Sequence, residues 1–264
     1  MKAKKVLPQY SISETDRNYF ASLCKDALLR RRTEGDFGFG TLAEKRMHAI
    51  LKHYICPNED FHEVGLNHTR YLSDVRIGND IYEIQTGSFY PMRKKIAYYL
   101  ENTDCTVTIV HPIAVRKWVS WVDPQTGEIS EAKKSPKRES ALDLLPELYC
   151  LLPSLNHPRL RFRLLYLEVR EFRMLDGWSR DRKRGSNRYE RIPLDLLGEE
   201  TFCAPADFAA LLPQDLPSPF TVKLFSKHTG LRGRRAYSAV HALQELGVIS
   251  PTTPIGRAMA FLKQ

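Results

Sequence analysis

Two stretches of alternating residues around a Gly-Asn pair place the strongest constraint on the fold. Residues 71–77 (Tyr-Leu-Ser-Asp-Val-Arg-Ile) and 81–85 (Ile-Tyr-Glu-Ile-Gln) alternate as β-strands do, and Gly78-Asn79 lies between them. Such a pair between two alternating runs is typical of a tight turn. The sequence therefore predicts an antiparallel hairpin over these residues.

The predicted hairpin brings polar side chains together. Glu83 and Gln85 are two residues apart, so their side chains lie on one face of the second strand. Pairing across the turn places Asp74 of the first strand close to both. Two carboxylates with an amide oxygen nearby are ligands that a hard cation such as Mg²⁺ or Mn²⁺ prefers. We therefore expect a metal site at Asp74 and Glu83, with Gln85 orienting water or metal.

The segments on either side of the hairpin predict a layered α/β fold. Residues 42–54 carry apolar side chains at helical spacing, and residues 61–66 alternate as a strand. A helix rich in Lys and Tyr follows Pro91, and residues 105–110 are rich in β-branched residues. The order helix, three strands, helix, strand is typical of an α/β protein with a mixed sheet flanked by helices. Glu44, on the helix before the sheet, is a further acid that we expect to reach the same pocket.

These residues resemble a known family of nucleases. Gly40-Thr41-Leu42-Ala43-Glu44, then Asp74, then Glu83-Ile84-Gln85 is similar to the PD-(D/E)XK, or restriction-endonuclease-like, superfamily. The resemblance covers roughly residues 40–115 and consists of motif spacing. It implies a restriction-endonuclease-like mixed sheet in which Asp74 and Glu83 bind the metal and Glu44 supports it.

One position departs from the pattern of that superfamily. Gln85 occupies the place where the family usually carries Lys, although some restriction endonucleases of this fold also carry Gln there. The change removes an ammonium that would stabilise charge in the transition state. Lys94 and Lys95, in the following helix, are candidates to supply that charge.

The balance of charges favours a polyanionic partner. The chain of 264 residues holds 40 Lys and Arg against 31 Asp and Glu, a net charge of +9, with a pI near 9.3. Clustered cations attract phosphates and release counterions on binding. Residues 180–188 are the most basic segment, and we expect them to contact phosphates; a solvated loop is the alternative. The candidate residues in this segment are Arg180, Arg182, Lys183, Arg184 and Arg188.

The last 45 residues predict a separate small domain. Residues 221–230 indicate an N-capped helix that ends at Gly230, residues 234–246 a second amphipathic helix, and residues 247–261 a β-hairpin. This order resembles a winged-helix domain, whose second helix commonly enters the major groove of DNA. Protein contact is the alternative. The candidate DNA contacts are Arg232, Arg234, Arg235, Ser238 and His241.

The predicted organisation has four parts: a helical leader over residues 1–35, the nuclease-like domain over 36–204, a Pro-rich linker over 205–219 and the winged-helix domain over 220–264. The five dispersed cysteines form no CxxC pair and indicate reduced thiols. No apolar run is long enough for a membrane helix, and no secretory signal is evident. We therefore expect a cytoplasmic protein without a membrane partner.

The preferred hypothesis is a metal-dependent DNA endonuclease. DNA is the expected partner. The sequence is also compatible with a homodimer. A DNA-binding protein or transcriptional regulator without catalysis is the alternative, in which Asp74, Glu83 and Gln85 form only a polar sheet face. A protein-interaction adaptor is a third class.

Overall fold

The computed structural model describes residues 12–33, 43–66, 69–175 and 187–264. Within these ranges, no helix combines the length and the apolar character that a membrane span requires. The chain is an α/β protein with a mixed sheet, which has seven strands in the described residues, and a small C-terminal antiparallel sheet. It divides into two compact units, which are described in turn. Unit 1 comprises Met1–Tyr54, Ala114–Arg138 and Leu164–Glu200, and unit 2 comprises Ile55–Ile113, Glu139–Arg163 and Thr201–Gln264.

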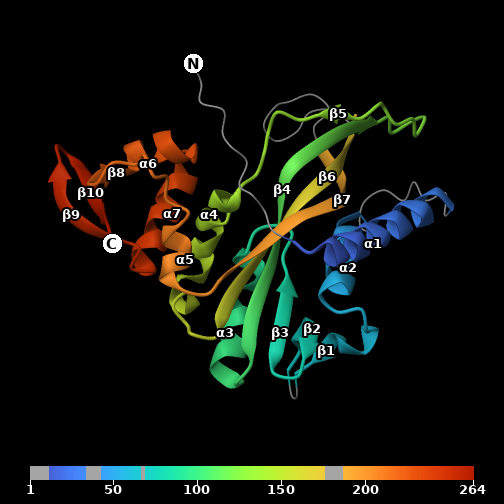
Figure 1. Ribbon diagram of the computed structural model, residues 1–264, viewed down its shortest axis with the longest axis horizontal. Coiled ribbons are helices and arrows are strands. Elements are labelled where there is room, and N and C mark those ends of the chain that lie inside the picture. Colours follow the sequence, from blue (N-terminus) through green and yellow to red (C-terminus); the bar gives the residue numbers. More distant parts are fainter. Residues whose placement is uncertain (1–11, 34–42, 67–68, 176–186) are drawn as a thin grey trace. The chain divides into compact units, whose positions relative to one another are not determined.

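The mixed sheet has the strand order β1-β2-β3-β4-β6-β7, and β5 pairs with β4 (Figure 1). Pairs β1–β2 and β2–β3 are antiparallel, whereas β3 and β4 are parallel and α3 connects them. The strands are β1 (His62–Gly65), β2 (Leu72–Ile77), β3 (Asp80–Ile84), β4 (Thr106–Val122), β5 (Lys133–Lys134), β6 (Leu160–Met174) and β7 (Asn187–Phe202). Strands β4, β6 and β7 contribute residues to both units.

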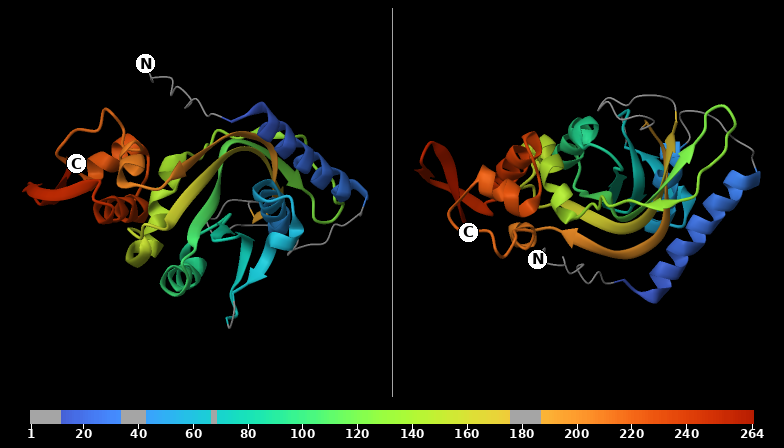
Figure 2. Two further views of the ribbon diagram at one scale, coloured as in Figure 1. Left: turned by 60° about the horizontal axis from the view of Figure 1, so that its bottom comes forward. Right: turned by 90° about the horizontal axis from the view of Figure 1, so that it is seen from above.

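Unit 1 contains α1 (Glu14–Thr33) and nearly all of α2 (Ala43–Ile55), which lie beside β7 (Figure 2). Helix α1 begins where the Ser13 hydroxyl accepts the Asp16 N–H at 3.0 Å, as an N-cap does. The ring of buried Phe20 meets that of Tyr54 edge to face, with 5.3 Å between centroids. The Arg17 guanidinium binds both carboxylate oxygens of Asp195 on β7, at 3.0 and 2.5 Å. Apolar contacts and a bidentate ion pair thus join helices and sheet in this unit.

Strand β4 is longer than the sequence predicts. Residues 105–110 and 117–122 each have the pattern of a strand, yet both belong to β4, which is continuous from Thr106 to Val122. Residues 123–127 (Asp-Pro-Gln-Thr-Gly) have the composition of a turn, and a turn is present there: Gly127 has φ +72°, and Val122 bridges to Ile129. Near the end of β4, Val122 packs with Phe172, Met174 and Ile192 in the core of unit 1.

In unit 2, the segment around residues 142–152, whose sequence pattern is typical of one helix, is divided. It forms η3 (Ala141–Asp143), α4 (Leu145–Leu148) and η4 (Tyr149–Ser154). Pro146 and Pro153 lack the backbone N–H that a continuous helix requires, which accounts for the interruptions. The other short elements before the C-terminal segment are η1 (Glu59–Phe61), η2 (Tyr90–Met92), α3 (Arg93–Asn102) and α5 (Pro205–Ala209).

The segment predicted as a Pro-rich linker, residues 205–219, contains packed structure. Pro205 begins α5, and the Asp207 carboxylate accepts the N–H groups of Cys203 and Ala204 at 2.7 and 2.8 Å. The buried Phe208 ring contacts the rings of Phe162 and Phe202, at centroid distances of 6.0 and 5.3 Å. Pro205 starts a helix, a position that its fixed φ angle favours.

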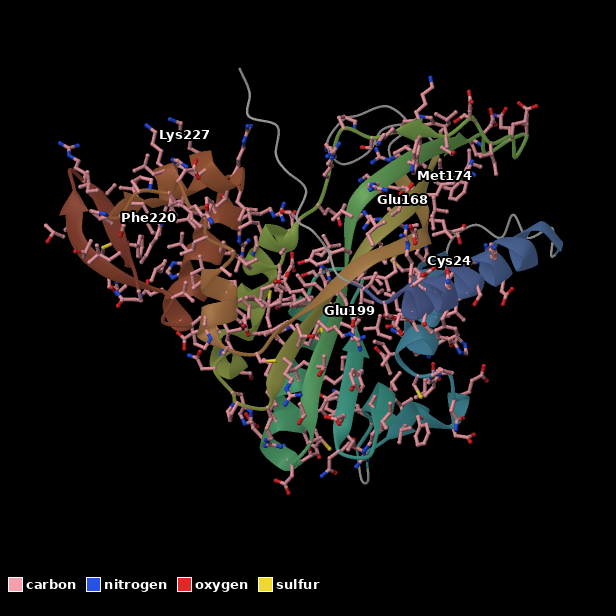
Figure 3. The ribbon with its side chains drawn as sticks, viewed as in Figure 1. Cys24, Glu168, Met174, Glu199, Phe220 and Lys227 are labelled. Atoms are coloured by element: carbon pink, nitrogen blue, oxygen red, sulfur yellow. The ribbon has the colours of Figure 1, made fainter. Side chains whose placement is uncertain are left out.

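The C-terminal segment of unit 2 combines two helices with a three-stranded sheet in the order β8-β10-β9. Its elements are β8 (Phe220–Thr221), α6 (Val222–Thr229), α7 (Arg234–Glu245), β9 (Ile249–Ile255) and β10 (Ala258–Lys263). The predicted ends of α6 are confirmed: the Thr221 hydroxyl accepts the Leu224 N–H, and Gly230 has φ +81°. Phe220, labelled in Figure 3, is buried between the rings of Phe225 and Phe261, with centroids 6.1 and 6.0 Å away.

Candidate functional site

The predicted hairpin is present as β2 and β3, joined by Gly78 and Asn79. Gly78 has φ +59°, a conformation that favours glycine. Val75 pairs with Tyr82, and Arg76 with Ile81. Continuing this antiparallel register by one pair places Asp74 opposite Glu83. Opposite residues in an antiparallel pair project from the same face, so the two carboxylates share one side of the sheet.

Asp74 is tied to the neighbouring strand through its side chain. Its Oδ2 accepts the backbone N–H of Ile84 at 2.7 Å. A carboxylate thus occupies a position in the strand pairing that a backbone carbonyl would usually occupy. This charge-assisted hydrogen bond fixes the orientation of the Asp74 side chain.

Glu83 is nearly inaccessible to solvent, with 3% of its surface exposed. Its Oε2 lies 2.6 Å from the Lys95 ammonium on α3. Burial raises the pKa of Glu83 to about 7, and the charge of Asp74 adds to the increase, whereas Lys95 opposes it. The carboxylate therefore sits in a weakly solvated place beside a second negative charge and is only partly compensated by one cation.

Tyr99 belongs to this site although the sequence did not single it out. It lies one helical turn after Lys95 on α3 and is fully buried. Burial raises the pKa of Tyr99, and the charge of Glu83 raises it further. The two groups interact electrostatically, but within the described residues neither the Tyr99 hydroxyl nor Glu83 Oε1 meets hydrogen-bond geometry with a partner. The i, i+4 spacing of Lys95 and Tyr99 was the available signal.

Gln85 follows directly after β3, and its side chain organises the loop that leads to α3. Its Nε2 donates to the Ser88 carbonyl at 2.5 Å. Its backbone carbonyl contacts His111 Nδ1 at 2.5 Å, and its N–H donates to the Val110 carbonyl at 2.9 Å. The backbone N–H and carbonyl of Gln85 thus both contact residues of β4, whereas its side-chain amide nitrogen is hydrogen-bonded within the loop. His111 is a second neighbour of the site that the sequence did not indicate.

The remaining acid and lysine of the predicted site are placed differently. Lys94 is exposed on α3, whereas the next residue, Lys95, forms an ion pair with Glu83. Glu44 lies on α2, and its side chain is outside the described residues. Among the side chains that are described, no three His, Cys, Asp or Glu residues gather around a common point. The described part of the site is therefore Asp74, Glu83, Gln85 and Lys95, with Tyr99 beneath.

The basic segment predicted to contact phosphates falls mainly outside the described residues. This holds for Arg180, Arg182, Lys183 and Arg184. Arg188 is on β7, but its side chain is not described.

The predicted DNA contacts on α7 divide into two groups. Arg232 and Arg234 are exposed, and Ser238 is half-buried. Arg235 donates from Nη2 to Asp143 Oδ1 at 2.7 Å, and the His241 ring contacts that of Tyr149 at 5.9 Å between centroids. Asp143 and Tyr149 belong to η3 and η4, so one side of α7 already faces protein within unit 2.

Comparison with known proteins identifies the family. Residues 45–203 match the family described as "Domain of unknown function (DUF8091)", and the chain belongs to it. A protein of Treponema pallidum (strain Nichols), described as uncharacterized, is 25% identical over 225 residues, which cover 85% of this chain and 87% of that protein. No solved structure matches the chain. The family match spans the hairpin, α3 and Lys95.

Proposed function

We propose that the chain is a metal-dependent nuclease of the PD-(D/E)XK type, which hydrolyses phosphodiester bonds in DNA. The observation that carries the proposal is the proximity of Asp74 to Glu83, whose charges interact, with the Lys95 ammonium 2.6 Å from Glu83. The connection of β3 through α3 to a parallel β4, after an antiparallel β1-β2-β3 meander, supports the same superfamily.

The donor set suits a divalent cation. Glu83 is buried beside the Tyr99 hydroxyl, and the charge of Asp74 is close enough to raise the pKa of Glu83. Two neighbouring carboxylates repel each other, and a divalent cation between them would offset that repulsion. Asp74 and Glu83 would hold Mg²⁺ or Mn²⁺. When bound, such an ion polarises a phosphoryl oxygen and lowers the pKa of a coordinated water.

Lys95 replaces the lysine that the superfamily usually carries two residues after the acid. In this chain that position is Gln85, which donates its amide N–H groups to the loop at Ser88. The Lys95 ammonium reaches the same carboxylate from α3 and places a positive charge beside the two acids. There it would stabilise the negative charge that develops on the scissile phosphate. Lys94, exposed one residue earlier, is not assigned this role.

The C-terminal segment would bring the enzyme to DNA. Two helices followed by a β-hairpin have the order of a winged-helix domain, and the second helix is α7. Arg232, two residues before α7, and Arg234, its first residue, are exposed and suit phosphate or base contacts. The other candidates for DNA contact are Arg235, Ser238 and His241. Of these, Arg235 also contacts η3, and His241 also contacts η4.

The test is a cleavage assay with matched variants. Purified protein is incubated with supercoiled and linear DNA in Mg²⁺, in Mn²⁺ and in EDTA. We expect cleavage only with metal, and a loss of about 100-fold or more in Asp74→Asn, which keeps a hydrogen-bond acceptor for Ile84 but loses the charge. Lys94→Gln serves as the control and should cleave as the wild type does. Metal-independent cleavage, or full activity in Asp74→Asn, would contradict the proposal.

A DNA-binding protein without catalysis is the second candidate. The observation that favours it is that Glu83 already has a cationic partner in Lys95, so the carboxylate is partly neutralised without metal. DNA binding that persists in every metal without cleavage, and that Asp74→Asn leaves unchanged, would select this alternative.

A further inference from the structure

Three tyrosines of unit 2 expose much of their rings to solvent. Tyr90 on η2, Tyr149 on η4 and Tyr237 on α7 are 58%, 41% and 58% exposed. A single exposed ring needs no explanation, but exposed rings that lie together mark a surface that meets a partner. Whether these three belong to one surface depends on how their elements pack.

The short helix η4 brings the three elements together. Both α3, which follows η2 directly, and α7 pack against η4 within unit 2. The ring of Tyr149 contacts that of His241 on α7, with 5.9 Å between centroids. Burial raises the pKa of the Cys150 thiol on η4, and the charges of Arg93 and Arg234 oppose the increase. The first residue of α3 and the first residue of α7 thus both lie close to η4.

Helix α7 presents one exposed face beside η4. Arg234, Tyr237 and His241 are all exposed, and their spacing of three and four residues places them on the same side of the helix. Ala236 and Val240, which lie between them in the sequence, are buried. The exposed face of α7 therefore carries a cation, a free-standing ring and the histidine that contacts Tyr149.

Tyr90 and Arg93 form a stacked pair next to the candidate nuclease site. Arg93 Cζ lies 3.6 Å from the centroid of the Tyr90 ring, and Arg93 Nη1 donates to the Tyr90 carbonyl at 2.6 Å. The Ser88 hydroxyl accepts the Tyr90 N–H at 3.3 Å, and the Ser88 carbonyl accepts the Gln85 amide at 2.5 Å. The pair is thus tied to the loop that begins at Gln85. A guanidinium stacked on a ring forms a flat cationic platform, on which a nucleobase can stack.

The charges of this surface suit a nucleic acid. Two acids close to it already hold partners: Asp143 accepts from Arg235 at 2.7 Å, and Glu147 accepts the Phe89 N–H at 3.2 Å. Cations between exposed rings fit a strand whose phosphates and base faces are both accessible. In a duplex the bases stack on one another, so the tyrosine rings could not reach their faces. The combination therefore favours a single strand over a duplex.

We propose that the three rings and two guanidinium groups form a binding surface for single-stranded DNA, made by Tyr90, Tyr149, Tyr237, Arg93 and Arg234. The bases stack on the rings, and the guanidinium groups contact the phosphates. This inference rests on the proposed function for the identity of its ligand, and it adds the strand structure of the substrate. Because the Tyr90 end adjoins the loop from Gln85, the substrate would be DNA with an unpaired segment next to the phosphodiester that is cleaved.

The experiment measures binding of labelled oligonucleotides to the full chain in EDTA, by fluorescence anisotropy. The probes are a single strand, a blunt duplex of the same sequence, and the same single strand with abasic positions, which keeps the phosphates but lacks bases to stack. We expect wild type to bind the single strand about fivefold or more tightly than either other probe, because only that probe offers free base faces.

Tyr237→Ala and Tyr90→Ala should each weaken binding of the single strand about fivefold or more and leave the abasic strand within about twofold of wild type. Tyr237→Phe and Tyr90→Phe are the matched controls, since each keeps the ring and should bind as the wild type does. Tyr90→Ala also removes the ring beneath Arg93, so Tyr237→Ala decides between stacking and a change in the guanidinium. Circular dichroism checks that each variant is folded.

Equal affinities of wild type for the single strand and the abasic strand, tighter binding of the duplex, or no binding of any probe would overturn the inference. Unchanged binding of the single strand by both alanine variants would overturn it as well. The proposed nuclease activity can fail separately. Preference for the single strand without cleavage in Mg²⁺ supports this surface and contradicts only the nuclease, whereas cleavage without the preference contradicts only this surface.

Discussion

Lys95 on α3 and Glu83 on β3 form an ion pair with 2.6 Å between Nζ and Oε2. The lysine is ten residues beyond Gln85, the position where the sequence pattern would place it, yet it reaches the same carboxylate. Because the parallel crossover from β3 to β4 lays α3 along the sheet, a residue on the helix can take the place of one on the strand.

Replacing Lys95 by Met should leave Glu83 without its cation. Removing one partner of a buried ion pair typically costs about 3–5 kcal/mol, so we expect a large decrease in the free energy of unfolding at pH 8. Burial already raises the pKa of Glu83 to about 7 from its ordinary 4.5, so the folded state favours the protonated form. Its ionisation therefore costs stability as the pH rises through this range, and the defect of Lys95→Met should be smaller at pH 5. Chemical denaturation at both pH values measures it.

The exposed neighbour Lys94 provides the control for this measurement. Lys94→Met should change the free energy of unfolding by no more than about 0.5 kcal/mol. The double variant Glu83→Gln/Lys95→Met should recover part of the loss, because it leaves no uncompensated charge. Equal effects of Lys95→Met and Lys94→Met at pH 8 would show that the ion pair contributes nothing.

Asp74 should contribute to stability through its hydrogen bond and to metal binding through its charge. Asp74→Ala removes the acceptor of the Ile84 N–H and should cost about 1–3 kcal/mol. Asp74→Asn keeps an oxygen acceptor and should lose less. Both should abolish stabilisation by added Mg²⁺ or Mn²⁺, which a thermal-shift titration detects. Retained metal stabilisation in Asp74→Asn would place the cation elsewhere.

Glu171 should make the stability of the protein sensitive to acid. Burial raises the pKa of Glu171, but Lys117, Arg173 and Arg191 together lower it to about 2, below its ordinary 4.5. The ionised group therefore contributes about 3 kcal/mol above pH 4.5, and this contribution is lost as the pH falls toward 2. Glu171→Gln should be strongly destabilised at pH 7, and the difference from wild type should narrow by pH 3. A difference that does not change between these pH values would contradict the assignment.

Arg234 should contact DNA more effectively than its neighbour Arg235. Both side chains are exposed, but Arg235 is already paired with Asp143 at 2.7 Å. We expect Arg234→Ala to weaken binding to duplex DNA several-fold and to reduce its salt dependence by about one contact. Lys227→Ala on α6 removes the same charge from the other helix and is the control; Lys227 points outward in Figure 3. Equal losses in the two variants would indicate general electrostatic attraction without a role for α7 in recognition.

The hairpin and its two acids could be predicted because the information is local. Gly78-Asn79 determines the turn, the turn determines the register, and the register places Asp74 opposite Glu83. The cap at Thr221 and the left-handed Gly230 are local signals of the same kind. Such features depend on a few adjacent residues, so the sequence is enough to identify them.

The choice between Lys94 and Lys95 depended on information that is not local. Helical spacing shows that Lys95 and Tyr99 share a face, but the burial of Ile96, Tyr99 and Leu100 decides which face meets the sheet. The ion pairs of Glu171 with Lys117, Arg173 and Arg191 are harder still to predict from the sequence, because these residues come from β4, β6 and β7. Their proximity depends on the order of strands in the sheet, which alternating residues within one strand do not reveal.

Asp74 has a further consequence for affinity. A carboxylate on a free side chain must give up rotamer freedom when a cation arrives, and that loss weakens binding. At Asp74 the freedom is already lost on folding, since Oδ2 is held by the Ile84 N–H. The strand pairing thus preorganises one ligand, and a loosened β2–β3 edge would weaken metal affinity even with every acid in place.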